Sequence, residues 1–429
     1  HSRRPRAGGA VDAQFRSGGG QGVRPFLARK SLRAVLIFPP WLALLAACAS
    51  YPENGGVRTR GYAYLAPPEV TFDLAQGRPI DSDGLARRLA RTRLLFLGEH
   101  HTEPRSHAFQ LETIKLLLKR GRQVTVALEM FPPSANEALQ AWRSGDAQEP
   151  EFLERSGWYR NWGFPWSHYR ELFLLLRRHG VPMRGINAER KTREAARKGD
   201  LSSLSSDLQE EIGPLADSPQ PHDAYLLDML RASGHGGEMS ADAPAFQAYR
   251  RVQVLWERLM GRRAARLAEQ AGAGGIVVVL IGSGHLAYGL GANLHAARAG
   301  VLAQLSIWDN VVTKAPGRQR YAVPLGVADL ARIYLRDPAE KGYPTLLGIK
   351  LELQGSDLRV KGTQLPAHAP LAALKTGDVI LALNGLPVTT PTALRLAYER
   401  LPLDSTARLK LRREGRELTL EVPVKPGQR

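Results

Sequence analysis

The stretch Arg93–Thr102, RLLFLGEHHT, decides how we expect the chain to fold. Leu94–Leu97 is a short apolar run typical of a buried strand, and it ends in a glycine, a glutamate and two histidines. The next segment, Ser106–Arg120, carries apolar side chains at helical spacing, and Val124–Leu128 again resembles a strand. A strand, a helix and a strand in close succession predict a right-handed parallel unit.

The same pattern returns later in the chain. Ile276–Ile281, IVVVLI, shows no polar alternation, as expected of a strand buried on both faces of a sheet. Leu302–Trp308 predicts a further strand, and the region 134–270 is mostly helical with a short strand at 182–187. We therefore predict an α/β fold: an open, mostly parallel sheet with a large helical insertion, followed by a small β-rich domain.

Composition limits the class of protein. The 429 residues are 43% hydrophobic and 23% charged, which is an ordinary globular balance. The formal charge of +18 is partly local, because residues 1–47 contain eight Arg or Lys and one Asp. The remaining excess is dispersed, and the sequence has no zinc finger, helix-turn-helix or RNA-binding signature. We expect no nucleic-acid partner, and an anionic ligand or membrane surface fits the charge better.

The N-terminal region resembles a bacterial lipoprotein signal. Basic residues precede an apolar run, Ala34–Leu45, and small residues lead to the single cysteine, Cys48. The alternative is a transmembrane anchor, but this run is short for the ~20 residues that a span needs. The resemblance implies that residues 1–48 are an upstream extension with a signal peptide, that Cys48 is lipidated, and that 49–79 form a tether. The expected location is the cell envelope, anchored in the outer membrane and facing the periplasm.

Polar side chains follow three of the predicted strands. The first strand leads to Gly98-Glu99-His100-His101, the second to Glu129, and the third to Gly282-Ser283-Gly284-His285. Each residue alone has a simpler explanation: Glu99, for instance, suits a helix cap. Ligands of open α/β sheets, however, bind beyond the carboxyl ends of the strands. Their equivalent positions therefore favour one shared functional site.

Two Gly-x-x-His motifs with a glutamate between them resemble the superfamily of Tiki proteins, TraB-type proteins, erythromycin esterases and ChaN. The segments LLFLGEHHTEPRSH, VQVLWERLM at 252–260 and GSGHLAYGLG at 282–291 are most similar to the ChaN-like haem-binding lipoproteins. This resemblance implies a haem-binding domain over residues 80–312 and a role in iron uptake or haem handling. It also implies haems stacked at a homodimer interface, with the iron held by tyrosine.

An aromatic segment before the middle of the chain is a candidate haem site. Residues 157–172, GWYRNWGFPWSHYREL, contain three Trp, two Tyr and one Phe, which suits an apolar haem site. The alternative is that these aromatic side chains attach the helical insertion to the sheet. The sequence leaves the iron ligand open among Tyr159, Tyr169 and Tyr288, and His168 and His107 are further candidate haem-binding residues.

The Tiki-like branch implies a different chemistry, a metal-dependent hydrolase or protease. Its divalent metal would be held by His101, Glu129 and His285, leaving an open position for water. Glu99 would complete the catalytic set as general base. The esterase branch fits less well, because its first motif has a histidine where this chain has Thr102.

The C-terminal region resembles bacterial PDZ domains. LKTGDVILALNG at 374–385 is similar to their most characteristic segment, and it ends in an Asn-Gly turn. We expect residues 313–342 to be a linker and 343–425 to be the PDZ domain. The resemblance implies that a protein C-terminus or peptide is added as a strand at Leu346, Leu347, Gly348 and Ile349. The alternatives are a spacer domain, or an adaptor protein whose α/β domain is inert.

Overall fold

A computed structural model describes residues 63–232, 239–337, 339–340, 342–344, 349–363 and 373–426. The signal peptide, Cys48 and most of the expected tether lie outside the described residues, as do Leu346, Leu347 and Gly348. No helix within the described ranges is long and apolar enough to cross a membrane.

The first domain is built on an eight-stranded sheet with the order β3-β2-β10-β8-β4-β7-β5-β6. The strands from β10 to β6 run parallel to one another, and β2 and β3 are antiparallel at one edge. The α/β fold class predicted from the sequence is therefore confirmed. The strands are β2 (Thr71–Asp73), β3 (Arg78–Ile80), β4 (Leu94–Glu99), β5 (Gln123–Leu128), β6 (Met183–Gly185), β7 (Gly275–Gly282), β8 (Gln304–Thr313) and β10 (Leu330–Arg336).

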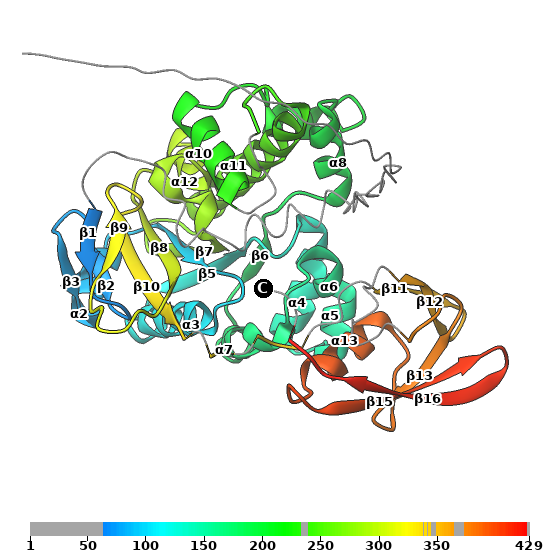
Figure 1. The fold of residues 1–429 in the computed structure, drawn as a ribbon. Helices are drawn as coiled ribbons and strands as arrows, with labels where there is room; N and C mark the ends of the chain where they lie inside the picture. Colours follow the sequence, from blue (N-terminus) through cyan, green and yellow to red (C-terminus); the bar gives the residue numbers. More distant parts are fainter. Residues whose placement is uncertain are drawn as a thin grey trace, which may run out of the picture. The chain divides into compact units, whose positions relative to one another are not determined.

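Helices cover both faces of this sheet (Figure 1). In β7, Val277, Val279 and Ile281 pack into one buried cluster with α11 and α12, whereas Val278 and Leu280 pack into a second cluster with α3, α4 and α7. The helices are α2 (Ser82–Leu89), α3 (Pro104–Lys119), α4 (Asn136–Ser144), α5 (Glu149–Ser156), α6 (Trp158–Asn161), α7 (Arg170–Arg178), α8 (Arg190–Lys198), α9 (Ser206–Ile212), α10 (Gln220–Ala232), α11 (Pro244–Gln270) and α12 (Ala292–Arg298).

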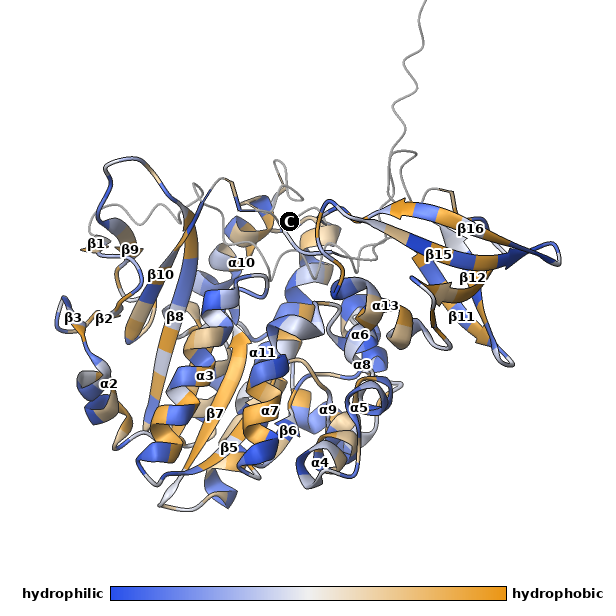
Figure 2. Cartoon of the chain, turned by 90° about the horizontal axis from the view of Figure 1, so that it is seen from below, coloured by the Kyte–Doolittle hydropathy of each residue, from blue (hydrophilic) through white to orange (hydrophobic). Residues whose placement is uncertain are grey.

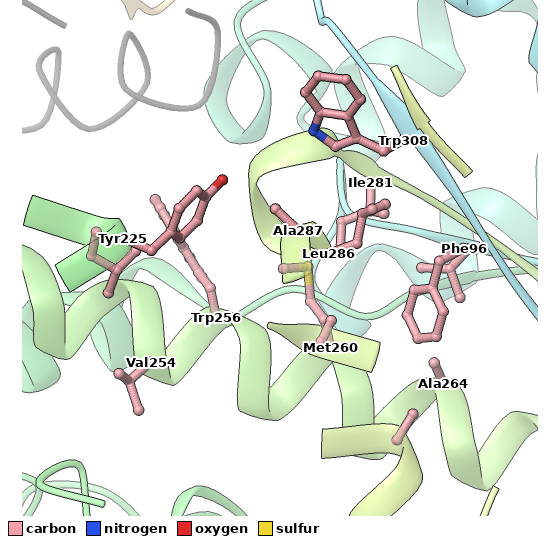
Figure 3. Packing of buried hydrophobic residues seen from close by; sticks show 14 of the residues in the cluster. Phe96, Tyr225, Val254, Trp256, Met260, Ala264, Ile281, Leu286, Ala287 and Trp308 are labelled. Atoms are coloured by element: carbon pink, nitrogen blue, oxygen red, sulfur yellow. The ribbon is translucent and has the colours of Figure 1, made fainter. Parts of the chain in front are cut away.

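Strand β7 is hydrophobic along its length, as the colouring in Figure 2 shows. All eight of its residues are buried, which explains why its sequence lacks alternation. Figure 3 shows part of the first cluster, in which Met260 and Ala264 of α11 join Phe96 of β4 and Ile281 of β7. Apolar packing on both faces thus stabilises the sheet, and the polar groups at the strand ends are attached to this well-packed core.

Two segments that the sequence analysis placed outside the first domain contain strands. Residues 313–342, expected to be a linker, contain β9 (Tyr321–Pro324) and β10, and β10 pairs with β8 along its whole length. The last part of the expected tether contains β1 (Ala63–Ala66), which pairs with β9, together with β2 and β3. Apart from the local β2–β3 hairpin, these strands pair with distant segments, so their own pattern gave little signal. The first domain therefore extends beyond residue 312.

The aromatic segment 157–172 contributes largely to the hydrophobic core. Trp158, Trp166 and Tyr169 are completely buried in the second cluster, where the Trp158 ring lies 5.6 Å from that of Phe131. This arrangement matches the alternative in which these aromatic side chains attach the insertion to the sheet. These buried aromatic side chains are consequently not available to contact a haem.

The C-terminal domain is β-rich and has a buried core of its own. Its sheet has the order β11-β12-β13-β15-β16, with β14 beside β13. The predicted Asn-Gly turn joins β13 to β14, and Asn384 and Gly385 have φ values of 49° and 81°, as a tight hairpin turn requires. Its elements are β11 (Ile349–Gln354), β12 (Asp357–Thr363), β13 (Val379–Leu383), β14 (Leu386–Pro387), α13 (Pro391–Glu399), β15 (Thr406–Arg413) and β16 (Arg416–Pro423).

Candidate functional site

The carboxyl ends of β4, β7 and β5 bring the three polar motifs together. Strand β7 lies between the other two, and its Gly282 is the register partner of Glu99 in β4. On the other side, the backbone N–H of Glu129 donates to Leu280 O over 3.1 Å. Parallel pairing therefore places the first Gly-x-x-His turn, the second turn and Glu129 at one edge of the sheet, as the sequence predicts.

Glu99 is the centre of a first buried network. Its Oε1 accepts hydrogen bonds from His101 Nδ1 at 2.7 Å and from the Tyr169 hydroxyl at 2.6 Å. Its Oε2 accepts one from Gln110 Nε2 at 2.7 Å and lies 3.6 Å from His107 Nδ1. The sequence could not distinguish His100 from His101; in the structure His101 is the buried partner of Glu99, and His100 is only partly buried.

The ionisation of this network is set by burial and by hydrogen bonds. Burial opposes the charged form of Glu99, but His107 and the hydrogen bonds from His101 and Tyr169 outweigh it and lower the pKa of Glu99 to about 2. Burial lowers the pKa of His107, and it lowers the pKa of His100 to about 3. The network therefore combines an ionised glutamate with neutral imidazole rings at neutral pH.

A second buried network runs from Glu129 through His285. Glu129 Oε2 accepts the Gly282 N–H at 2.6 Å, and its Oε1 lies 3.3 Å from His285 Nε2. His285 Nδ1 lies 3.2 Å from Glu257 Oε1, and Glu257 Oε2 lies 2.9 Å from His222 Nε2. Glu257 belongs to α11 and His222 to α10, and the sequence analysis identified neither. Within an amphipathic helix these residues resemble ordinary polar positions.

The second network also contains an ionised glutamate, but the pKa of its histidine is shifted in the opposite direction. Burial opposes the charged form of Glu257, but His222 and His285 outweigh it and lower the pKa of Glu257 to about 2. Burial also opposes protonation of His222, yet the Glu257 carboxylate outweighs it and raises the pKa of His222. This network therefore favours the protonated form of His222 beside the Glu257 carboxylate.

The two networks meet at Gly282. A Cβ atom on this residue would lie 3.0 Å from His101 Cε1, 3.2 Å from His101 Nε2 and 3.6 Å from Glu129 Oε2. The His101 ring therefore lies closer than a Cβ atom usually allows, whereas Glu129 Oε2 lies at an ordinary contact distance. The glycine of the second motif lets the His101 ring pack tightly against the end of β7, beside Glu129.

Asp309 of β8 is a third buried carboxylate at this edge. It accepts hydrogen bonds from the hydroxyl groups of Ser106 and Ser283, the latter at 2.6 Å, and it is only 3% exposed. Burial raises the pKa of Asp309 to about 7, against the effect of the two serine hydrogen bonds. Sequence analysis missed it because the predicted strand ended at Trp308. The one available signal was an acidic residue directly after the apolar pair Ile307 and Trp308.

The five candidate haem-binding residues divide into two groups. Tyr169 and His107 are buried within the first network, where the Tyr169 hydroxyl donates to Glu99 and His107 Nε2 lies 3.2 Å from His101 O. Tyr159, His168 and Tyr288 are partly buried and lie on different elements. An iron ligand must present its oxygen or nitrogen to the metal, and within the second group the Tyr159 hydroxyl and His168 Nδ1 are themselves buried atoms.

The proposed metal ligands lie close together but do not form a metal-binding group as they stand. No group of three or more His, Cys, Asp or Glu side chains suited to a metal ion occurs among the residues that the structure describes. In addition, each ring nitrogen of His285 faces a carboxylate, Glu129 on one side and Glu257 on the other. A divalent ion at His101, Glu129 and His285 would require these contacts to change.

Of the four expected peptide-binding residues, only Ile349 is described. It begins β11, an edge strand of the C-terminal sheet, and its side chain is buried in that domain's core. An edge strand has backbone groups available for pairing with an added strand.

Two regions of the chain match known protein families. Residues 85–295 match the family described as haem-binding uptake, Tiki superfamily, ChaN, and residues 345–424 match the PDZ domain family. No curated protein matches the chain.

Several solved structures are similar to parts of the chain. One, described as cofacial haem binding to ChaN of Campylobacter jejuni, is 17% identical, covers 61% of this chain and 95% of that one, and has a TM-score of 0.47. An erythromycin esterase mutant in its open conformation is 12% identical and covers 59% of this chain and 83% of that one, with a TM-score of 0.34. The serine endoprotease from Yersinia pestis is 21% identical and covers 20% and 30%, with a TM-score of 0.17.

Proposed function

Since residues 85–295 belong to the ChaN haem-binding family of the Tiki superfamily, we propose that this chain binds haem, in iron acquisition or haem handling. The observation that carries the proposal is the extent of the family match, which includes both Gly-x-x-His turns and Glu129. The buried networks behind these turns support it, because they hold the strand ends in fixed positions against which a ligand can bind.

Tyr288 is the tyrosine that we propose as iron ligand. It follows the second Gly-x-x-His turn by three residues, is partly buried, and packs its ring 5.7 Å from that of Tyr225. Its φ of 59° is unfavourable for a residue with a side chain, and its N–H donates to Val327 O at 2.7 Å. Such backbone strain is concentrated at functional sites. Bound haem would supply the iron centre, and Tyr288 would supply a phenolate oxygen to it.

The experiment that tests this assignment is a haemin titration of Tyr288→Phe. We expect this variant to lose the tyrosinate charge-transfer absorption and to bind haemin at least about tenfold more weakly than the wild type, because it lacks the phenolate ligand. Tyr169→Phe is the matched control, since that hydroxyl donates to Glu99 inside the protein. Equal spectra for Tyr288→Phe and the wild type would reject Tyr288 as the ligand, and the same titration of Tyr159→Phe and His168→Ala would then examine the other partly buried candidates.

Lipid anchorage and location form a separate part of the proposal. The segment from Ala34 to Cys48 supports lipidation at Cys48, and the residue after it, Ala49, favours the outer membrane with the domain facing the periplasm. The family resemblance also supports a homodimer in which two haems stack. Cys48→Ser should release the chain from the membrane fraction, and an unchanged distribution between membrane and soluble fractions would reject the anchor.

The PDZ domain is proposed to dock a partner through a peptide C-terminus. The support is the PDZ family match together with β11 at the edge of the sheet, where an added strand would pair. Ile349→Asn should weaken capture of C-terminal peptides from a display library, and the same peptides with amidated C-termini should bind less well. Equal binding of free and amidated termini would reject carboxylate recognition.

A second candidate function is metal-dependent hydrolysis at His101, Glu129 and His285. The approach of His101 and Glu129 to the same point beside Gly282 favours it. The carboxylate on each side of His285 weighs against it. Stoichiometric manganese, cobalt or zinc in the purified chain, lost in His101→Ala, would favour the hydrolase over haem binding.

A further inference from the structure

Asp309 occupies a position between the two Gly-x-x-His turns. It lies on β8, which pairs with β4 on one side and with β10 on the other. Its two carboxylate oxygens accept from different serines, Ser106 at the start of α3 and Ser283 in the second turn. No function considered above uses this carboxylate.

Each serine is connected to a different turn. Ser106 Oγ accepts the backbone N–H of His100 at 3.3 Å, which ties it to the first turn. Ser283 belongs to the second turn, and its Oγ also accepts the backbone N–H of Asp309 at 3.0 Å. The turns are in close contact here, because a Cβ on Gly98 would lie only 2.5 Å from Ser283 Oγ. Asp309 is therefore the common acceptor through which the first and second turns are joined.

A purely structural aspartate, Asp329 directly before β10, binds a serine of β8 and provides a comparison. Asp329 accepts the hydroxyl and the N–H of Ser306 at 2.7 and 2.8 Å, and this pair only attaches the start of β10 to β8. Asp309 differs because it joins two turns of the ligand site.

The charge environment of Asp309 is unfavourable for an ionised carboxylate. The titratable groups that face it are Glu99 at the end of β4, Glu103 before α3 and the Tyr334 hydroxyl of β10. None of these supplies a positive charge. Burial and these acidic neighbours raise the pKa of Asp309 to about 7, so its charge changes within the physiological range.

We propose that Asp309 is a positioning residue for the haem site: its ionised carboxylate holds both Gly-x-x-His turns together, and its protonation releases one of them. This inference rests on the proposed haem-binding function. An ionised carboxylate accepts both serine hydroxyl protons. A carboxylic acid carries its own proton toward one serine, and the hydroxyl proton of that serine then loses its acceptor. One turn is consequently held less firmly.

The test compares haemin affinity at two pH values for the full chain and its Asp309→Asn variant, which mimics the neutral acid. We expect Asp309→Asn to bind haemin about tenfold more weakly than the wild type at pH 8, the loss that corresponds to one hydrogen bond to a charged group. At pH 5.5 the two proteins should bind equally. Using the ratio of the two affinities removes the pH dependence of haemin itself. An equal ratio at both pH values would mean a merely structural role and would overturn the proposal.

Two further variants make the outcome specific. Ser283→Ala removes one of the two hydroxyl groups and should weaken binding at pH 8 by a similar factor, even if Asp309→Asn folds poorly. Ser306→Ala, which removes the hydroxyl from the comparison pair, should behave like the wild type at both pH values. If Ser306→Ala shows the same pH-dependent loss as Asp309→Asn, the effect does not come from the connection between the turns and the proposal fails.

Hydrogen exchange at the His100 amide provides a readout that does not require haem. In Asp309→Asn this amide should exchange faster than in the wild type at pH 8 and at the same rate at pH 5.5. The amides of the second turn are followed in the same experiment, and unchanged exchange in both turns at pH 8 would overturn the proposal. If the exchange result holds while no variant binds haemin, the connection between the turns stands and the haem-binding function fails.

Discussion

Two buried networks at the same sheet edge both place an ionised glutamate beside histidines, yet they shift the histidine pKa values in opposite directions. Glu99 receives hydrogen bonds from two neutral donors, Tyr169 and Gln110, in addition to His101. Both described contacts of Glu257 are with histidine rings, those of His222 and His285. A carboxylate that accepts hydrogen bonds from neutral donors can be buried beside neutral imidazole. A carboxylate that contacts only imidazole rings instead raises the pKa of an imidazole and favours its protonation.

This difference gives the two networks opposite dependences on pH. The pKa of His107 is lowered, so below about 6.5 the unfolded chain binds a proton that the folded one does not, and stability falls as the pH falls. The pKa of His222 is raised, so its contribution is fully present below about 6.5 and is lost as the pH rises through its folded-state pKa. Substitutions in the two networks should therefore respond differently to pH.

The largest effect is expected from Glu99→Gln in the first network. Several buried donors would lose a charged acceptor, which should reduce the free energy of unfolding by about 4 kcal/mol. Urea denaturation at pH 7 measures this loss. Glu112→Gln, on the exposed side of α3, is the matched control and should change stability by less than about 0.5 kcal/mol. Similar losses for the two variants would show that the Glu99 network contributes little.

Glu257→Gln should have the next largest effect, and its size should depend on pH. We expect a loss of about 3 kcal/mol at pH 6, where His222 is charged, and a clearly smaller loss at pH 9. The loss for Glu99→Gln should change little over the same range because burial already lowers the pKa of its neighbour His107. Denaturation curves of both variants at the two pH values make the comparison. A flat response of Glu257→Gln would contradict the ion-paired description of the second network.

Asp309→Asn should stabilise the protein at high pH, although it weakens the ligand site. Because the pKa of Asp309 is raised to about 7, its contribution is fully present below its unfolded-state pKa of about 3.8 and is lost as the pH rises through 7. Removing the ionisable group should therefore add roughly 2 kcal/mol at pH 8 and nothing near pH 4. Thermal unfolding at these two pH values measures the gain, and a loss of stability at pH 8 would contradict it.

The smallest effect is expected from Gly282→Ala, which adds a methyl group where the two networks meet. The new Cβ would press on the His101 ring, and we expect a loss of about 1 kcal/mol with a shifted NMR resonance for that ring. Gly284→Ala is the matched control in the same turn, because its Cβ would face the flexible end of Met229 at 3.3 Å. If Gly284→Ala shifts the His101 resonance as much as Gly282→Ala does, the two networks do not meet at Gly282.

The convergence of His101, Glu129 and His285 could be predicted from the sequence, because parallel strands end at one edge and each motif directly follows a strand. Glu257 and His222 could not be predicted, since only the packing of α10 and α11 against the second turn turns these helical positions inward. The strands β9 and β10 were missed because non-local pairing, rather than their own pattern, makes them part of the sheet.

The central claim, that the α/β domain binds haem, is tested most directly by titrating the full chain with haemin and following the Soret absorbance together with thermal unfolding. We predict a saturable shift of the Soret band with a fixed stoichiometry. The unfolding temperature should rise over the same concentration range, because a ligand that binds only the folded state stabilises it. A Soret change that does not saturate, together with an unchanged unfolding temperature, would contradict haem binding.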